Sequence, residues 1–229
     1  MRTQSKETQA QLTPAKALEI LKEGNERFIR NLKANRNLLQ QVNETSSGQF
    51  PFATILSCMD SRTSSELIFD QGLGDIFSVR VAGAVLNEDV LGSMEFATRI
   101  AGSKVIVVLG HTKCGAVIGA CNQVKLGKLS MLLDKIQPAI DSEKFTRVDR
   151  SGNNETFVRN VTENHVHLTI RRIREESEII RTLEENGLII IVGGVYDVET
   201  GKVHFFDGTE EKKQPTGGVG TVKSNDLAG

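Results

Sequence analysis

Four short apolar runs, separated by segments of helical periodicity, constrain the fold more than any other feature of the chain. They occupy residues 52–58, 76–83, 104–110 and 188–197, and the third, KVIVVLG, is apolar at consecutive positions. Continuous apolar character is typical of strands that are buried on both faces of a sheet. Strands of this kind that alternate with helices predict an α/β fold with a mostly parallel sheet of about four strands, flanked by helices.

A fifth run at 202–206 follows the fourth after the short turn ETGK. A parallel crossover needs about a dozen residues or more, so this last strand is expected to be antiparallel at an edge of the sheet. Residues 35–50 are polar and are expected to be irregular. The spacing from Thr63 to Glu66 is that of a capping box. Helices are expected at 14–34, 63–72, 87–101 and 165–186, with a further helix that begins near Cys114.

Nothing in the sequence divides the chain into two folding units, because it contains no internal repeat and no linker between its strands. We expect a helical N-terminal arm over residues 1–50, an α/β domain over 51–213 and a Gly-rich C-terminal tail over 214–229. The arm is expected to pack on a partner subunit, since a short arm on a small domain leaves its apolar face partly exposed.

Charge and hydropathy argue against several classes of function. The 229 residues carry 28 basic and 29 acidic side chains, which is not the basic surface of a nucleic-acid-binding protein. No apolar run approaches the ~20 residues of a transmembrane helix, so no membrane association is expected. The polar N-terminus lacks the apolar segment of a signal peptide and predicts a cytoplasmic protein; a chain whose signal had been removed would look the same.

Candidate metal ligands follow the first and third apolar runs. Cys58 ends the first run, and His111 and Cys114 come directly after the third. The carboxyl ends of parallel strands form the sites of α/β sheets, so these side chains converge if the two strands are neighbours. Two thiolates and an imidazole are a ligand set for catalytic zinc, with the fourth position open.

Each of these fragments alone has a simpler explanation. A cysteine that ends a buried strand is usually a small core residue, and an HxxC spacing is common. Their equivalent positions after two strands favour metal ligation, whereas a thiol redox site is disfavoured because no CxxC motif is present. Cys121 lies about 10 Å along a helix from Cys114 and is expected in the core. Three histidines have no companion ligand and are expected to be surface or core residues: His165, His167 and His204.

Asp60 and Arg62 stand beside the first candidate ligand. A carboxylate two residues from a zinc ligand can bind the metal or lie just outside its ligands. A bidentate Arg62 would keep Asp60 ionised and turned away from the ion. Asp60 would then accept a hydrogen bond from a metal-bound water and orient it. A structural ion pair at the start of a helix is the alternative.

The motif CxDSR at 58–62, followed by HxxC at 111–114, resembles the β-class carbonic anhydrase family. The likeness continues through GDIFSVRVAG and GHTKCGAV to GGVYDVETGKV and covers nearly the whole chain. It implies an enzyme with one Zn²⁺ per chain in which zinc-bound hydroxide attacks CO2 in an apolar pocket. The reaction is the reversible hydration of CO2 to bicarbonate and a proton. The resemblance also implies a homodimer or a dimer of dimers.

The resemblance assigns roles to the residues of these two motifs. Cys58, His111 and Cys114 become the zinc ligands, and Asp60 with Arg62 becomes the catalytic dyad. In an alternative closed state, Asp60 itself is the fourth ligand, and opening requires it to swing onto Arg62.

Other positions match the family or depart from it. Gln49 stands where the family has a substrate-orienting glutamine that reaches the site across the dimer interface. Phe77 and Phe96 stand where the family lines its CO2 pocket. Residues 81–84 read VAGA and lack two asparagines usual in the family, which leaves rate and substrate preference open. Ile55 stands where the bicarbonate-regulated subtype has a tryptophan, so that form of regulation is not expected.

Two further functions are compatible with the same residues. A hydrolase of CS2 or COS could use the same zinc hydroxide on the same scaffold, because these molecules are also linear. A non-enzymatic zinc protein would use the metal only to hold the two loops together, and Asp60 bound to the metal at every pH would favour it.

Overall fold

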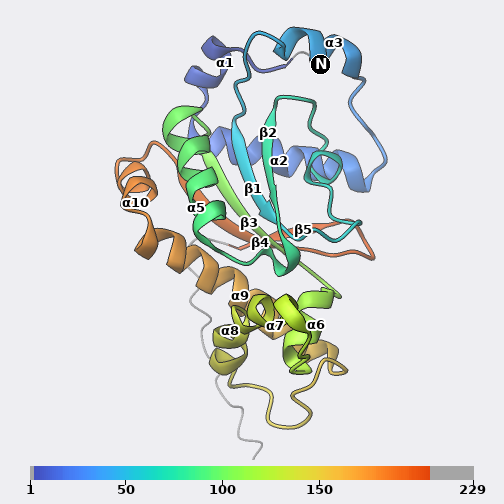
Figure 1. The fold of residues 1–229 in the computed structure, drawn as a ribbon. Helices are drawn as coiled ribbons and strands as arrows, with labels where there is room; N and C mark the ends of the chain where they lie inside the picture. The colour runs from blue at the N-terminus through green and yellow to red at the C-terminus, as the bar shows by residue number, and fades with distance from the viewer. Residues whose placement is uncertain (1–2, 207–229) are drawn as a thin grey trace, which may run out of the picture.

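One five-stranded sheet, in the order β2-β1-β3-β4-β5, organises residues 3–206, the part of the chain that the computed structural model describes (Figure 1). Four strands run parallel: β1 (Ala53–Ser57), β2 (Ile76–Arg80), β3 (Val105–His111) and β4 (Ile190–Tyr196). The short β5 (Val203–Phe205) pairs antiparallel with β4 at one edge. The predicted fold class is confirmed; every strand lies inside the run that predicted it except β3, which extends one residue further, to His111.

Helices cover both faces of this sheet and extend beyond one end of it (Figure 1). A 3₁₀ turn, η1 (Ala82–Ala84), and a π-helical turn, η2 (Phe96–Ile100), interrupt the regular pattern. The α-helices are α1 (Lys6–Gln11), α2 (Pro14–Ile29), α3 (Leu38–Thr45), α4 (Ser65–Ile68), α5 (Glu88–Glu95), α6 (Gly115–Cys121), α7 (Gly127–Asp134), α8 (Gln137–Ser142), α9 (Glu155–Glu176) and α10 (Glu178–Glu185). None of the helices within residues 3–206 combines the length and apolar character that crossing a membrane requires.

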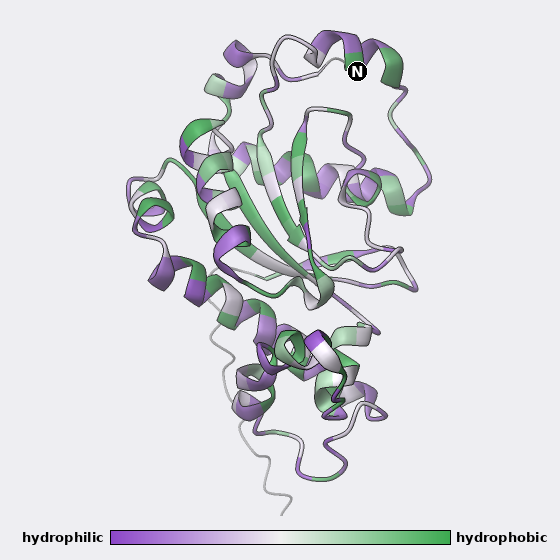
Figure 2. Ribbon diagram, viewed as in Figure 1, coloured by the Kyte–Doolittle hydropathy of each residue, from purple (hydrophilic) through white to green (hydrophobic). Residues whose placement is uncertain are grey.

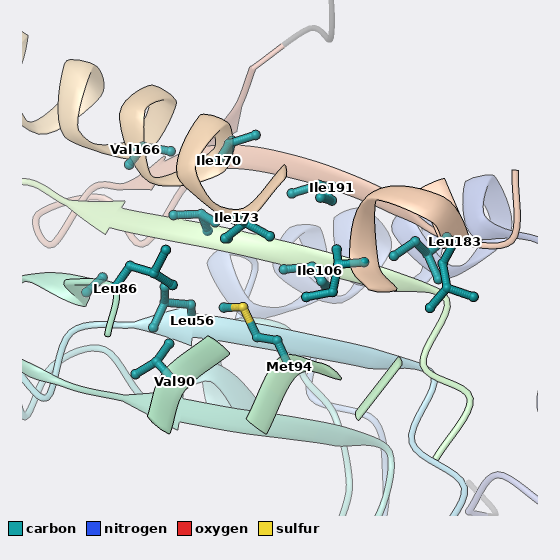
Figure 3. Close-up of a cluster of buried hydrophobic side chains, with 14 residues drawn as sticks. Leu56, Leu86, Val90, Met94, Ile106, Val166, Ile170, Ile173, Leu183 and Ile191 are labelled. Carbon is teal, nitrogen blue, oxygen red and sulfur yellow. The ribbon is translucent and has the colours of Figure 1, made fainter. Parts of the chain in front are cut away.

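The side chains of β3 alternate between two hydrophobic clusters. Val105 and Val107 belong to the cluster under α2 and α4, while Ile106 belongs to the cluster under α5, α9 and α10. In Figure 3, Ile106 and Leu56 of the sheet lie between Met94 of α5 and the apolar side chains of α9. Figure 2 accordingly shows apolar residues concentrated in the strands and polar residues along much of the helix surfaces. Burial on both faces explains why β3 reads as a continuous apolar run.

The N-terminal region contains more helix than the sequence predicted. The helix expected over 14–34 ends at Ile29, and residues 35–50, expected to be irregular, contain α3. The segment between these helices is fixed by Asp70, which accepts from Arg27 Nε at 2.6 Å and from Arg36 Nη1 at 2.5 Å. These ion pairs join residues far apart in the sequence and leave no local pattern, so the sequence did not predict that the segment between α2 and α3 is held in place.

Two helix starts also differ from expectation. The capping box between Thr63 and Glu66 does not form, because the Thr63 hydroxyl bonds to the carbonyls of Cys58 and Asp60, and α4 is only one turn long. The helix expected from residue 165 begins at residue 155 and is interrupted at Ser177, whose side chain caps α10. The predicted end of the domain at 213 and the tail over 214–229 lie outside the described residues.

Candidate metal centre

The parallel pairing of β1 with β3 brings the three candidate ligands together. Cys58 is the first residue after β1, His111 is the last residue of β3, and Cys114 is the N-cap of α6. Their ligand atoms all lie within 4.8 Å of one another, and all three residues are buried. The residues predicted from two separate loops therefore form one compact donor group.

The imidazole of His111 is oriented for metal binding. Its Nδ1 lies 2.8 Å from the carbonyl oxygen of Thr112, and because a carbonyl only accepts, Nδ1 carries the proton. Nε2 then has a lone pair available for a metal ion, and this nitrogen is buried without a hydrogen-bond partner among residues 3–206. Buried polar atoms are normally satisfied, so an unpartnered nitrogen beside two sulfurs fits a bound cation. The carbonyl that fixes the tautomer is the usual outer support of a ligating histidine.

The two ligand thiols share a proton. The neighbouring Cys114 thiol, which donates to the Cys58 sulfur, and the backbone N–H groups of Asp60 and Gly83 lower the pKa of Cys58. The pKa of Cys114 is raised because its proton is bound to the Cys58 sulfur and because it is buried. A cation that binds both sulfurs displaces this proton. Cys121 lies in the core as expected, and burial raises its pKa to about 11.

Asp60 and Arg62 form a bidentate pair next to the donor group. Arg62 donates from Nε to Oδ1 at 2.9 Å and from Nη2 to Oδ2 at 2.7 Å. These bonds hold the pKa of Asp60 well below its usual range, so the carboxylate is ionised at neutral pH. The carboxylate is turned onto Arg62 and is not part of the three-residue donor group.

A residue that sequence reasoning missed holds the first ligand loop. Arg80, at the end of β2, donates from Nε to the carbonyl of Cys58 at 3.2 Å and from Nη2 to the carbonyl of Asp60 at 2.7 Å. Thr63 donates to the same two carbonyls from inside the loop, at 2.8 and 2.9 Å. Because β2 pairs with β1, an arginine at the carboxyl end of β2 could have been predicted from the sequence to lie beside the loop that follows β1.

The turn between β4 and β5 holds the second ligand loop. The N–H of Val198 donates to the Thr112 hydroxyl at 3.0 Å, and Lys113 is ion-paired with Glu199. The backbone of Lys113 is left-handed, with φ at 55°, so this loop needs outside support to keep its shape. These contacts keep the backbone fixed between His111 and Cys114.

A comparison with known families decides what this arrangement represents. The family model described as carbonic anhydrase matches residues 53–203, which include the four parallel strands and both ligand loops. The chain is also similar to Carbonic anhydrase 2 of Mycobacterium tuberculosis, with 37% identity over 194 residues that cover 82% of this chain and 91% of the relative. The chain belongs to the carbonic anhydrase family.

Solved structures place it in the β-class of that family. The β-carbonic anhydrase CafA of Aspergillus fumigatus is 26% identical, with a TM-score of 0.63, and the match covers 86% of this chain and 91% of that chain. A tetrameric β-carbonic anhydrase from Sordaria macrospora shares the fold at 21% identity, with a TM-score of 0.61 over 72% of this chain and 89% of that chain. The resemblance found in the two sequence motifs is thus confirmed.

Three residues that the carbonic anhydrase resemblance implied lie apart from the donor group of this chain. Gln49 is exposed in the loop between α3 and β1. Phe77 and Phe96 pack edge to face, with ring centroids 6.4 Å apart, and line an open surface hollow between β2 and α5. The cavity at the ligands is separate and small, at about 10 Å³, which is room for about one water molecule. The substrate-binding roles of Gln49, Phe77 and Phe96 stay predictions.

Gly83 contacts the first ligand from outside the two loops. Its N–H donates to the Cys58 sulfur at 3.3 Å, and its φ of 67° is in the left-handed region. A Cβ at this position would lie 3.0 Å from Ile136 Cδ1 and 3.1 Å from Ala116 Cβ. Both the backbone conformation and the packing therefore require glycine here.

Gly83→Ala is expected to lower the free energy of unfolding by about 1–3 kcal/mol, because it combines an unfavourable φ with a tight contact. The matched control is Gly92→Ala on α5, where an added Cβ meets nothing within 4 Å. That substitution is expected to stabilise the helix by about 0.5–1 kcal/mol. Urea unfolding of both variants measures the difference, and equal stabilities would contradict this account of Gly83.

Proposed function

We propose that this chain is a zinc-dependent carbonic anhydrase that reversibly hydrates CO2 to bicarbonate and a proton. The observation that supports this most strongly is the buried group of two sulfurs and an unpartnered imidazole nitrogen beside an ionised carboxylate. Membership of the carbonic anhydrase family makes CO2 the first substrate to test.

Cys58, His111 and Cys114 would hold the metal, and zinc suits them best. Two thiolates and an imidazole match zinc better than Mg²⁺ or Ca²⁺, which prefer oxygen ligands. Three protein donors leave the fourth position for a water molecule. A zinc ion bound there acts as a Lewis acid that makes water a nucleophile near neutral pH.

Asp60 and Arg62 would orient the attacking water. Arg62 occupies both oxygens of Asp60 and keeps the carboxylate off the metal position. Ionised Asp60 can then accept a hydrogen bond from the water and fix the direction of its lone pair toward CO2. Arg62 Nη2 also donates to the carbonyl of Lys113 at 3.4 Å, so the dyad bridges the two ligand loops.

The working form is proposed to be a homodimer or a dimer of dimers. Gln49 and Phe96 are exposed, and the hollow beside Phe77 is open, so within one chain they do not enclose a substrate. Apolar side chains of the N-terminal arm, Leu38 and Leu39 on α3 among them, are exposed as well. A partner chain packed on these surfaces would bring Gln49 and the two phenylalanines to an enclosed site. The tetrameric Sordaria relative supports the same assembly.

Stopped-flow CO2 hydration by the zinc-loaded protein, scanned from about pH 6.5 to 9, is expected to show activity that rises with pH, because zinc-bound water titrates in this region. Cys58→Ala should abolish both the activity and the binding of one zinc per chain. Cys121→Ala is the matched control, a buried cysteine outside the donor group, and should keep both. Zinc binding without CO2 hydration at any pH would contradict the proposal and direct the search to CS2, COS or a structural role.

Arg62→Ala is expected to lower CO2 hydration about 10- to 100-fold while one zinc per chain is retained, because the arginine orients Asp60 and does not bind the metal. The matched control is Arg174→Ala, which removes a similarly exposed bidentate pair with Glu184 away from the site. Activity and metal content measured on the same preparations separate the two roles. Full turnover by Arg62→Ala would show that the dyad assignment is wrong.

Small-angle scattering is expected to give at least twice the 25.1 kDa mass of one chain. Phe96→Asp should shift the protein toward monomer and lower its activity, because it places a charge in the proposed interface. Leu188→Asp is the matched control, since Leu188 is 53% exposed and Phe96 is 54% exposed. A fully active monomer of the unchanged protein would contradict the proposed assembly.

A further inference from the structure

The Cys58 sulfur accepts hydrogen bonds from two backbone N–H groups. One comes from Asp60, two residues away in the same loop, at 3.4 Å. The other comes from Gly83, in the η1 turn after β2, at 3.3 Å. The second bond depends on how a separate part of the chain holds this turn.

The η1 turn has a backbone that needs support. Gly83 and Ala84 both have positive φ, at 67° and 52°, and an alanine rarely adopts this conformation. Backbones of this kind persist where the surrounding structure holds them. The N–H of Ala84 donates to the carbonyl of Val81 at 2.9 Å and holds the turn from one side.

His165 holds the turn from the other side. It lies on α9, 82 residues along the chain, and its Nε2 is 3.0 Å from the Gly83 carbonyl. The residue is only 7% exposed, and burial lowers the pKa of His165 to about 4, so the ring is neutral at the pH values at which zinc enzymes work. Because a carbonyl only accepts, the single ring proton is on Nε2 and is donated to Gly83.

These bonds fix the direction of the N–H that meets the sulfur. The peptide between Gly83 and Ala84 is anchored through its carbonyl by His165 and through its N–H by Val81. This peptide and the one whose N–H reaches Cys58 flank the same α-carbon, that of Gly83. His165 also lines the small cavity beside the donor group, together with Cys58 and Gly83.

We infer that His165 is a positioning residue for the metal centre, which acts through Gly83 to keep an N–H on the Cys58 sulfur. The inference rests on the proposed function, in which that sulfur is a zinc ligand. A hydrogen bond to a ligating sulfur draws electron density away from it, and such outer contacts tune metal centres. A less donating sulfur leaves more Lewis acidity on the bound ion, which matters where two thiolates already supply negative charge.

Cobalt-loaded protein tests this without reference to activity, because the thiolate-to-cobalt charge-transfer absorption reports on sulfur donation. His165→Met removes the donor at similar volume and is expected to move this absorption to longer wavelength. Zinc affinity, measured by competition with a chromophoric chelator, should fall about 10- to 100-fold, because the η1 turn would no longer hold the Cys58 sulfur in place. In His165→Gln, the amide N–H₂ lies about as far from the backbone as the histidine Nε2 and can donate to the Gly83 carbonyl. The absorption of this variant should therefore lie close to that of the unchanged protein. Thr169→Val, a buried change one turn further along α9, is the matched control and should leave it in place.

Circular dichroism establishes whether His165→Met is folded. If the folded variant shows the thiolate-to-cobalt absorption at its original wavelength, the inference is wrong. If that variant does not fold, His165→Gln is compared with His165→Asn, whose shorter amide does not reach Gly83. Equal band positions in these two variants likewise overturn it. Cobalt-loaded unchanged protein with no thiolate absorption would overturn the proposed function itself, whereas an unmoved band overturns the role of His165 alone.

Discussion

The parallel pairing of β1 with β3 is the constraint on which the rest of the structure depends. Ser57 pairs with Leu109, so the chain leaves β1 beside the last residues of β3, and Cys58 emerges next to His111. Both strands are buried on their two faces, and successive side chains pack in two different hydrophobic clusters. A slip of one residue would exchange their apolar faces and move the sulfur away from the imidazole.

Groups from β2, from the turn between β4 and β5 and from the η1 turn then hold the ligand loops, together with Thr63 of the first loop itself. Arg80 and Thr63 bind the carbonyls of the first loop, and the turn between β4 and β5 binds the second. The η1 turn, supported by His165, contacts the Cys58 sulfur directly. A donor group held from so many sides is fixed before a metal arrives, so little free energy is spent on ordering it.

The sequence predicted what depends on local pattern. The strands follow from continuous apolar runs, and the donor group follows from residues placed at the carboxyl ends of two such runs. What it missed depends on long-range contacts: α3 beside the ion pairs of Asp70, Thr63 bonded into the site loop, and His165 on the Gly83 carbonyl. The role of His165 has no sequence pattern because its partner is a backbone carbonyl, which a residue of any type can supply.

X-ray absorption of the zinc-loaded protein tests the central claim, that Cys58, His111 and Cys114 bind one metal ion. The account predicts two sulfur ligands at about 2.3 Å, one imidazole nitrogen at about 2.0–2.1 Å and one further light atom. Loss of one sulfur in Cys58→Ser, and of neither in Cys121→Ser, would assign the ligands. A spectrum with a single sulfur or with three sulfurs would contradict the claim.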